Sequence, residues 1–175
     1  MSVTVRPQRP PRIFLIDPGV HYARLLTALL TDAGYHDVRW FASTDIALEA
    51  LSELTCDTIL IDQDSKPDSA VDFTRMLRRD HVSAGRFTPV ILMASQATPE
   101  VVTKARDAGV TEILVKPVSA GALAMRVRTC LELPRNFIQS GEFFGPDRRR
   151  RKGTYDGPER RNRAPTKVEM PDTAD

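Results

Sequence analysis

The sequence predicts an α/β protein built on a doubly wound, five-stranded parallel sheet. Short, continuous apolar runs alternate along the chain with segments of helical periodicity, which is typical of parallel strands buried on both faces. Three of these runs end at a charged side chain: residues 13–16 at Asp17, residues 58–61 at Asp62, and residues 112–115 at Lys116. Because ligands of such sheets bind beyond the carboxyl ends of the strands, we expect these three side chains to share one crevice.

The first half of the chain supplies the first helices of this pattern. A strand at 12–16 precedes a helix at about 20–33, and Gly34 stands where a left-handed glycine often ends a helix. A short strand at 38–41 follows, and Ser43 is the expected N-cap of the second helix.

The second half continues the alternation. A third helix around residues 73–77 precedes a strand at 89–93. Thr98 has the features of an N-cap, with proline and an acidic residue directly after it, and Gly109 marks the expected end of that fourth helix. Ser119 opens the fifth helix, so the chain contains about five strand–helix units.

Composition and charge divide the chain into a body and a tail. The 175 residues, with 41% hydrophobic and 27% charged, suit one globular domain with an attached segment. Residues 13–134 carry 12 Lys and Arg against 16 Asp and Glu, a net charge of about −4, whereas residues 135–163 carry 9 against 4, about +5. We therefore expect a flexible N-terminus at 1–10, a domain at 11–134, and an extended, Arg-rich, largely disordered tail at 135–175.

The cysteines and the apolar segments indicate the cellular compartment. Cys56 and Cys130 form neither a disulfide framework nor a metal-binding spacing, so we expect inert thiols in a reducing environment. No segment approaches the about 20 apolar residues that span a bilayer, and the first 12 residues have no signal-peptide core. A cytoplasmic protein without membrane contact is expected.

The residues at the strand ends resemble those of the CheY-like receiver domain of bacterial two-component response regulators, over roughly residues 10–133. The resemblance rests on Asp17, on Asp62 and on Lys116-Pro117 at their strand ends, with matching positions at Gly34 and Ala47-Leu48. It implies the flavodoxin/CheY-like strand order 2-1-3-4-5, for which CheY is itself a reference example.

The resemblance also implies a role for each of these side chains. Asp62 would be the phosphoacceptor that receives a phosphoryl group from a kinase histidine. Mg²⁺ would be held by Asp17, Asp62 and the backbone carbonyl of Asp64, since this ion prefers oxygen ligands. Lys116 would neutralise charge on the phosphoryl group, and Pro117 would follow a cis peptide bond, which X-Pro sequences tolerate.

Several positions depart from the family pattern. The second acidic residue of the metal-binding pair is replaced by Pro18, which should weaken Mg²⁺ binding. The strand-four hydroxyl aligns with Ala94, and Ser95 could replace it only if the strand has already ended there. The strand-five aromatic residue aligns with Ile113. We therefore expect a phosphorylation site that is retained and a conformational switch that is weakened.

Two functions fit these residues. The first is a single-domain response regulator that receives a phosphoryl group at Asp62 from a sensor histidine kinase or a histidine phosphotransfer protein, and then signals by contact with a downstream protein. The alternative is a phosphorylation-independent pseudo-receiver that acts as an adaptor through its surface and basic tail. Mg²⁺ affinity distinguishes the two. No Gly-rich phosphate loop or nucleophile–base pair indicates an enzyme.

The basic tail allows a third kind of partner. A short sequence motif is duplicated at residues 145–149 and 157–161. Its Gly-Pro pairs predict a flexible chain from about residue 145 onward. Arginine clusters with interleaved aromatic residues can bind nucleic acid, which is one option for the segment from Arg148 to Arg163. Acidic residues inside the clusters and the lack of a DNA-reading module favour a solvated tail, or a docking segment for a protein or for the chain's own acidic domain.

Overall fold

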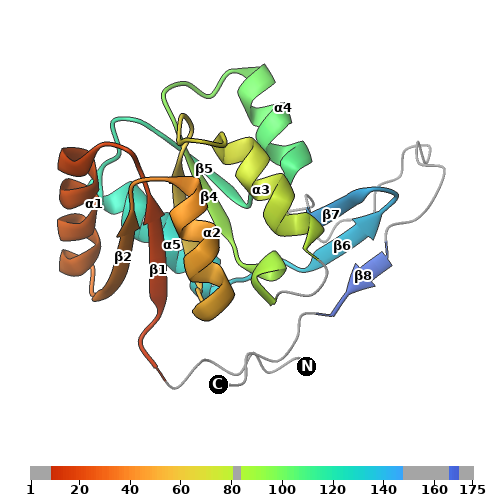
Figure 1. Ribbon diagram of the computed structural model, residues 1–175, viewed down its shortest axis with the longest axis horizontal. Coiled ribbons are helices and arrows are strands. Elements are labelled where there is room, and N and C mark those ends of the chain that lie inside the picture. The colour runs from red at the N-terminus through yellow and green to blue at the C-terminus, as the bar shows by residue number, and fades with distance from the viewer. Residues whose placement is uncertain (1–8, 81–83, 148–165, 170–175) are drawn as a thin grey trace.

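The fold is a five-stranded parallel sheet between two layers of helices, as the sequence predicts (Figure 1). The computed structural model describes residues 9–80, 84–147 and 166–169. The strands of the sheet are β1 (Arg12–Ile16), β2 (Asp37–Phe41), β3 (Thr58–Asp62), β4 (Val90–Ala94) and β5 (Glu112–Val115). Their order is β2-β1-β3-β4-β5, which confirms the expected doubly wound arrangement.

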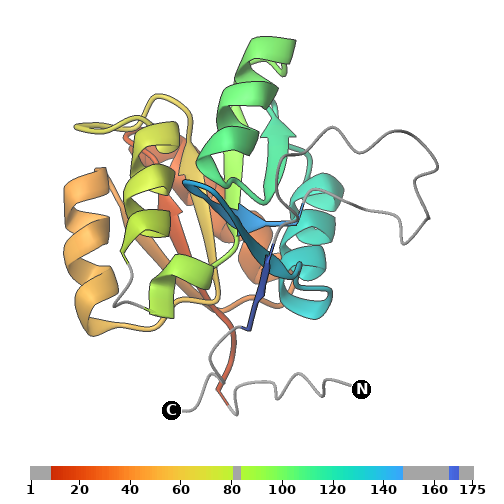
Figure 2. The same cartoon turned by 90° about the vertical axis from the view of Figure 1, so that its right-hand side faces the viewer.

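The helices alternate with these strands along the chain. They are α1 (Val20–Asp32), α2 (Thr44–Glu53), α3 (Ala70–Arg79), α4 (Pro99–Ala108) and α5 (Ala120–Glu132), with a short 3-10 helix, η1 (Ala84–Phe87), before β4. Helices α1 and α5 cover one face of the sheet, and α2, α3 and α4 cover the other (Figures 1 and 2).

The core consists of two apolar clusters, one on each face of the sheet. Along β1, Ile13 and Leu15 belong to the cluster under α1 and α5, whereas Phe14 and Ile16 belong to the cluster under α2, α3 and α4. Neighbouring residues of a strand point to opposite faces, so a strand covered on both sides must be apolar at every position. This explains the continuous apolar runs in the sequence.

The parallel register brings the ends of three strands together. Ile16 of β1 lies beside Ile61 of β3, Asp62 lies beside Met93 of β4, and Ala94 lies beside Val115 of β5. The residues at and just beyond these carboxyl ends therefore lie along one edge of the sheet.

Most of the expected helix ends are present. Thr98 accepts a hydrogen bond from the Val101 amide at the start of α4, and Ser119 does the same at the start of α5. Gly109 ends α4 with a φ of 92°. Ser43 precedes α2 as expected, but its side chain caps no backbone amide.

Residues 137–146, which belong to the tail that the sequence predicts to be extended, form two strands. Strands β6 (Phe137–Ser140) and β7 (Phe143–Pro146) form an antiparallel hairpin that turns at Gly141, where φ is 58°. A third strand, β8 (Thr166–Val168), pairs with the other edge of β6. The β7 strand contacts α3 and α4, so the hairpin packs on the helical layer (Figure 2).

The expected boundary at residue 134 is wrong for residues 137–146, and aromatic packing is the reason. Phe137 and Phe144 are 2% and 7% exposed, and the three ring centroids of Phe87, Phe137 and Phe144 lie 5.3–5.4 Å apart. Strands of four residues are too short to show a clear period in the sequence.

The Gly145-Pro146 pair is part of this packing and does not interrupt it. A Cβ atom on Gly145 would lie 3.1 Å from the Gly109 Cα atom, so glycine permits the close approach of β7 to the end of α4. Pro146 lies on an edge strand, where a missing amide is tolerated.

The ends of the chain are described only in part. Arg9, expected in a flexible N-terminus, forms an ion pair of 2.8 Å with Asp57. The other residues expected to be flexible, 1–8, and the remaining tail residues, 148–165 and 170–175, lie outside the described part of the chain. Within the described part, no helix has the length and apolar character needed to cross a membrane.

Candidate functional site

The three charged side chains predicted from the strand ends meet in one place. Asp17 directly follows β1, Asp62 is the last residue of β3, and Lys116 directly follows β5. The Lys116 ammonium group contacts the Asp62 carboxylate, and its Nζ atom lies 4.0 Å from Asp17 Oδ2. Both carboxylates are buried, with 3% of Asp17 and 6% of Asp62 exposed. The result is a compact cluster of two negative charges and one positive charge.

Backbone amides orient both carboxylates. The Gly19 amide donates a hydrogen bond of 2.8 Å to Asp17 Oδ1, and the Asp64 amide donates one of 2.9 Å to Asp62 Oδ1. In both cases the amide belongs to the residue two places further on, which is the local hydrogen bond that aspartate forms in turns. Each carboxylate therefore has one oxygen fixed by the backbone, while the other oxygen is directed toward Lys116.

Asp17 has an unmet requirement for positive charge. Its Oδ2 atom is buried and has no hydrogen-bond partner. Burial raises the pKa of the Asp17 carboxyl group above its ordinary value, and the nearby Asp62 charge raises it further, while the Gly19 amide and Lys116 act in the opposite direction. A cation next to Oδ2 would relieve both the desolvation and the repulsion.

The ligand atoms present suit a hard cation, although they are few. Mg²⁺ is commonly bound by one or two carboxylates together with waters and phosphate oxygens, and Asp17 and Asp62 meet that minimum. Among the described residues, no group of three or more Asp, Glu, His or Cys side chains could hold a metal. The residue after Asp17 is Pro18, whose side chain offers no oxygen ligand.

The remaining predicted residues surround the charged cluster. The side chain of Asp64 is exposed, so it adds no carboxylate to the site. The backbone oxygen of Ala94 accepts a 2.9 Å hydrogen bond from the Lys116 amide, which ties the ends of β4 and β5 together. The Lys116–Pro117 peptide bond is cis, as is the Lys66–Pro67 bond in the loop after β3.

The three residues at the expected switch positions are ordinary core and loop residues. Ala94 is fully buried as the last residue of β4, and Ser95 is exposed just outside the strand. Ile113 is partly buried and packs against the cluster under α2, α3 and α4. Because β4 ends at Ala94, the alternation of faces along the strand does not fix the direction of the Ser95 side chain. This is the condition under which the Ser95 hydroxyl group could replace the missing hydroxyl group at Ala94.

Two aromatic residues at the site have no counterpart in the sequence prediction. The Trp40 indole Nε1 atom donates a 2.9 Å hydrogen bond to the Asp17 backbone oxygen, and Lys116 Nζ lies 4.8 Å from the centroid of the Tyr22 ring. Trp40 is on the edge strand β2 and Tyr22 is on the first turn of α1. Neither is a charged residue at the end of a buried apolar run, so the sequence pattern that indicates the site does not include them. Their contacts with Asp17 and Lys116 in the folded protein are what connect them with the site.

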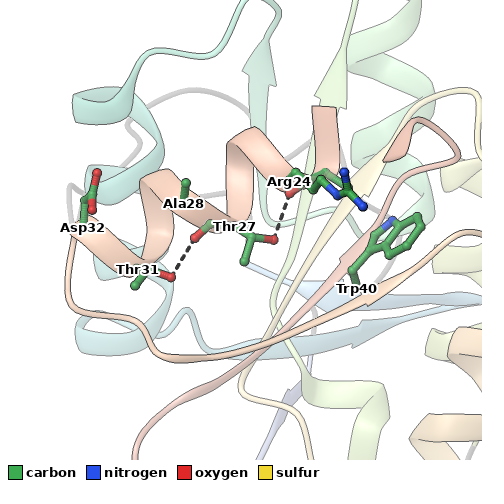
Figure 3. Close-up of a pocket in the computed structure, with 7 residues that line it drawn as sticks. Arg24, Thr27, Ala28, Thr31, Asp32 and Trp40 are labelled. Atoms are coloured by element: carbon green, nitrogen blue, oxygen red, sulfur yellow. Dashed lines mark hydrogen bonds between the residues drawn. The ribbon is translucent and has the colours of Figure 1, made fainter. Parts of the chain in front are cut away.

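A pocket of about 400 Å³ lies between α1 and β2 (Figure 3). The hydroxyl groups of Thr27 and Thr31 donate to backbone oxygens of α1, so they are not directed into the pocket as free donors. Arg24 and Trp40 lie at one end, and Asp32 at the other (Figure 3). With its apolar lining, the pocket supplies no chemistry comparable to that of the Asp17–Asp62–Lys116 cluster.

The fold and the charged cluster are those of a receiver domain, and comparison with known proteins agrees. The model of the response regulator receiver domain family matches residues 13–128. This chain therefore belongs to the response regulator receiver family of two-component signalling. The match ends before the β6–β7 hairpin.

Curated relatives share the receiver portion of the chain. The sensory/regulatory protein RpfC of Xanthomonas campestris is 30% identical over 115 residues, which cover 66% of this chain and 16% of RpfC. The probable transcriptional regulatory protein SilR of Salmonella typhimurium is 29% identical over 135 residues, which cover 75% of this chain and 55% of SilR. The chain spans about half of SilR and much less of RpfC.

Solved structures share the fold at lower sequence identity. The chemotaxis response regulator CheY4 of Vibrio cholerae superposes with a TM-score of 0.64 at 22% identity, covering 70% of this chain and all of that one. The receiver domain of sensor histidine kinase PA1611 from Pseudomonas aeruginosa PAO1 gives a TM-score of 0.63 at 22% identity, covering 71% and 99%. That domain has a magnesium ion coordinated in its active site cleft.

Proposed function

We propose that this protein receives a phosphoryl group on Asp62 from a phosphohistidine of a sensor histidine kinase or a histidine phosphotransfer protein. The contact between Lys116 and the buried Asp62 carboxylate, with Asp17 beside both, is the observation that carries the proposal. Output then occurs by protein–protein contact with a downstream partner. The role is signalling and not catalysis of a metabolic reaction, and the two free cysteines suit a cytoplasmic site of action.

The proposed chemistry is an in-line phosphoryl transfer. A carboxylate oxygen of Asp62 attacks the phosphorus atom of the phosphohistidine, the P–N bond breaks as the P–O bond forms, and the histidine nitrogen keeps the electron pair and takes up a proton from solvent. Negative charge spreads over the three equatorial phosphoryl oxygens. Lys116 already contacts the attacking carboxylate, so its positive charge lies next to the oxygens that become more negative.

Mg²⁺ is the cofactor that we propose for this site. Asp17 and Asp62 would hold it together with the backbone carbonyl of Asp64, and the ion would supply charge neutralisation and orientation of the phosphoryl oxygens. The buried, unpartnered Asp17 Oδ2 atom supports this assignment from the chain's own geometry.

A second function, the phosphorylation-independent adaptor, is favoured by a different observation. Ala94 offers no hydroxyl group and Ile113 no aromatic ring, so neither switch position has the group that would report a phosphoryl group on Asp62. In that case the Asp17–Asp62–Lys116 cluster would be an ion-paired remnant, and the protein would act through its surface and its basic tail. The segment from Arg148 to Arg163 lies outside the described residues.

Phosphoryl transfer is tested directly by intact mass. After incubation with acetyl phosphate and Mg²⁺, we expect one phosphate adduct on the wild-type protein and none on the Asp62→Asn variant, because an amide oxygen is a far weaker nucleophile than a carboxylate. Adding EDTA to the incubation should prevent the adduct from forming on the wild-type protein. A folded wild-type protein that stays unmodified, both by acetyl phosphate and by a panel of phosphorylated histidine phosphotransfer proteins, would favour the adaptor.

Restoring the missing acidic residue should strengthen the metal site. We expect Pro18→Asp to bind Mg²⁺ on the order of tenfold more tightly than the wild-type protein, since ligand charge tunes the affinity of such sites. Calorimetry measures the change. Trp40 fluorescence gives a second readout, because this is the only tryptophan of the chain and its indole nitrogen bonds to the Asp17 backbone.

The control for this substitution is Pro18→Ala, which removes the proline ring without adding charge. Its affinity should equal that of the wild-type protein. If Pro18→Ala binds Mg²⁺ as tightly as Pro18→Asp, backbone freedom and not the carboxylate limits the site.

A further inference from the structure

The aromatic ring of Tyr22 lies next to the ammonium group of Lys116. The distance from Nζ to the ring centroid is 4.8 Å, well inside the about 6 Å range of cation–π attraction. Tyr22 is the third residue of α1, so the contact links the first helix to the loop after β5. No charged residue is involved on the Tyr22 side, which distinguishes this contact from the ion pairs of the site.

The ring is well fixed by its surroundings. Tyr22 packs against the apolar cluster under α1 and α5, and its position on a helix limits its side-chain rotamers. Its hydroxyl oxygen is buried and has no hydrogen-bond partner among the described residues. The tyrosine therefore contributes a rigid aromatic face at Lys116, and its hydroxyl group adds no observed interaction.

Lys116 needs such support in this chain. Its side chain has four rotatable bonds and is 27% exposed, so solvent competes with the site for the ammonium group. The contact with Asp62 will weaken as that carboxylate becomes an acyl phosphate, and Asp17 Oδ2 is 4.0 Å away, beyond direct hydrogen-bonding distance. The Tyr22 ring contacts the ammonium group directly, and phosphorylation of Asp62 leaves the ring chemically unchanged.

From this geometry we propose that Tyr22 is a positioning residue for phosphoryl transfer to Asp62. Its ring holds the Lys116 ammonium group in the crevice, so that the group is in place to neutralise the phosphoryl oxygens. This rests on the proposed function of Asp62, and it adds a residue that the receiver-like pattern of aspartates and lysine does not include.

The rate of phosphate incorporation from acetyl phosphate and Mg²⁺, followed by intact mass, tests the proposal. Tyr22→Leu should be modified about fivefold more slowly, which corresponds to a typical cation–π contact of about 1 kcal/mol. Tyr22→Phe keeps the ring and should react at the wild-type rate. Tyr35→Leu is the matched control, because Tyr35 packs against the same apolar cluster while its hydroxyl group lies near Glu132 and Arg128 of α5.

A double-mutant cycle separates positioning from a general structural effect. With Lys116→Met as the background, the Tyr22→Leu substitution should slow the reaction no further, because there is no ammonium group left to hold. An equal fivefold effect in both backgrounds would overturn the proposal. So would a Tyr22→Phe variant as slow as Tyr22→Leu, which would assign the effect to the hydroxyl group.

A readout that does not depend on phosphorylation keeps the two hypotheses apart. Ring currents should shift the proton NMR signals next to Nζ of Lys116 upfield in the wild-type protein and in Tyr22→Phe, but not in Tyr22→Leu. Unshifted signals in the wild-type protein would overturn the contact itself. Shifted signals in a protein that neither acetyl phosphate nor the panel of phosphotransfer proteins modifies would instead refute the proposed function, and the positioning role would fall with it.

Discussion

Arg78→Met is expected to lower the free energy of unfolding by about 3 kcal/mol, because it leaves several backbone oxygens without their donor. The Arg78 side chain lies on α3, is 3% exposed, and forms no ion pair with a carboxylate among the described residues. Its guanidinium group donates to the backbone oxygens of Gly109, Arg86 and Thr88 at distances of 2.7–3.2 Å. One side chain thus joins α3, the segment before β4 and the end of α4.

The estimate balances two opposing contributions. Burial lowers the pKa of the Arg78 guanidinium group, so replacing it with a neutral side chain removes a desolvation cost. Against this stand the carbonyl groups left unpaired, at about 1–3 kcal/mol each, and the loss of the contact between Arg78 and the Phe137 ring, 5.0 Å from its centroid. Methionine fills most of the volume, so cavity formation adds little.

Denaturant unfolding measures the effect, and the next residue supplies the control. Arg79 is exposed on the same turn of α3, so Arg79→Met should change the stability by no more than about 0.5 kcal/mol. If both variants unfold at the same denaturant concentration, the buried hydrogen bonds of Arg78 contribute nothing net to the fold.

The sheet and the charged cluster could be predicted from the sequence because their determinants are local. A strand covered on both faces must be apolar throughout, and Gly109 and Thr98 carry their helix-end preferences within a few residues. The convergence of Asp17, Asp62 and Lys116 needs no side-chain detail, since parallel register alone places the three strand ends along one edge.

The contacts of Arg78, Tyr22 and Trp40 could not be predicted because they depend on how layers pack. Arg78 lies four residues after the buried Thr74, on the inward side of α3. From the sequence, a charged residue at that position is expected at the solvent-exposed border of the apolar stripe. Only the presence of three carbonyl groups opposite it explains why a guanidinium group is buried there. Such acceptors come from segments 8 to 31 residues away in sequence.

The tail shows the limit of composition as a guide. Charge and the Gly-Pro pairs at 145–146 and 157–158 place residues 135–147 in the Arg-rich tail, although three phenylalanines lie among them. The free energy gained by burying an aromatic side chain depends on the area removed from water. It is therefore as large for phenylalanines without a regular spacing as for those that recur with the period of a helix or a strand. Phe137 and Phe144 bury that area against Phe87 and the helical layer.

A chain that ends at Pro134 is therefore expected to lose about 4–6 kcal/mol of stability, even though it contains the whole receiver family match. The shortened chain loses the buried side chains of Phe137 and Phe144, each worth about 2–3 kcal/mol. It also loses Arg135, which forms an ion pair with the buried Glu112 carboxylate. Because domains of this size are stable by only about 5–15 kcal/mol, the loss should bring the shortened chain close to unfolding.

A chain that ends at Asp147 is the matched control for this prediction, since it keeps both strands of the hairpin and Arg135. Urea unfolding should place it within about 1 kcal/mol of the full chain, because the β8 strand that it lacks is mostly exposed.

In the full chain, Phe144→Ala should cost about 3–5 kcal/mol, which tests the same packing if the shortened chain aggregates. Equal midpoints for the chains ending at 134 and 147, with a neutral Phe144→Ala, would show that the receiver domain is complete without its hairpin. A separation of several kcal/mol would instead make the hairpin part of one cooperative unit with α3 and α4, because Arg78 and the close approach of Gly145 to Gly109 join them directly.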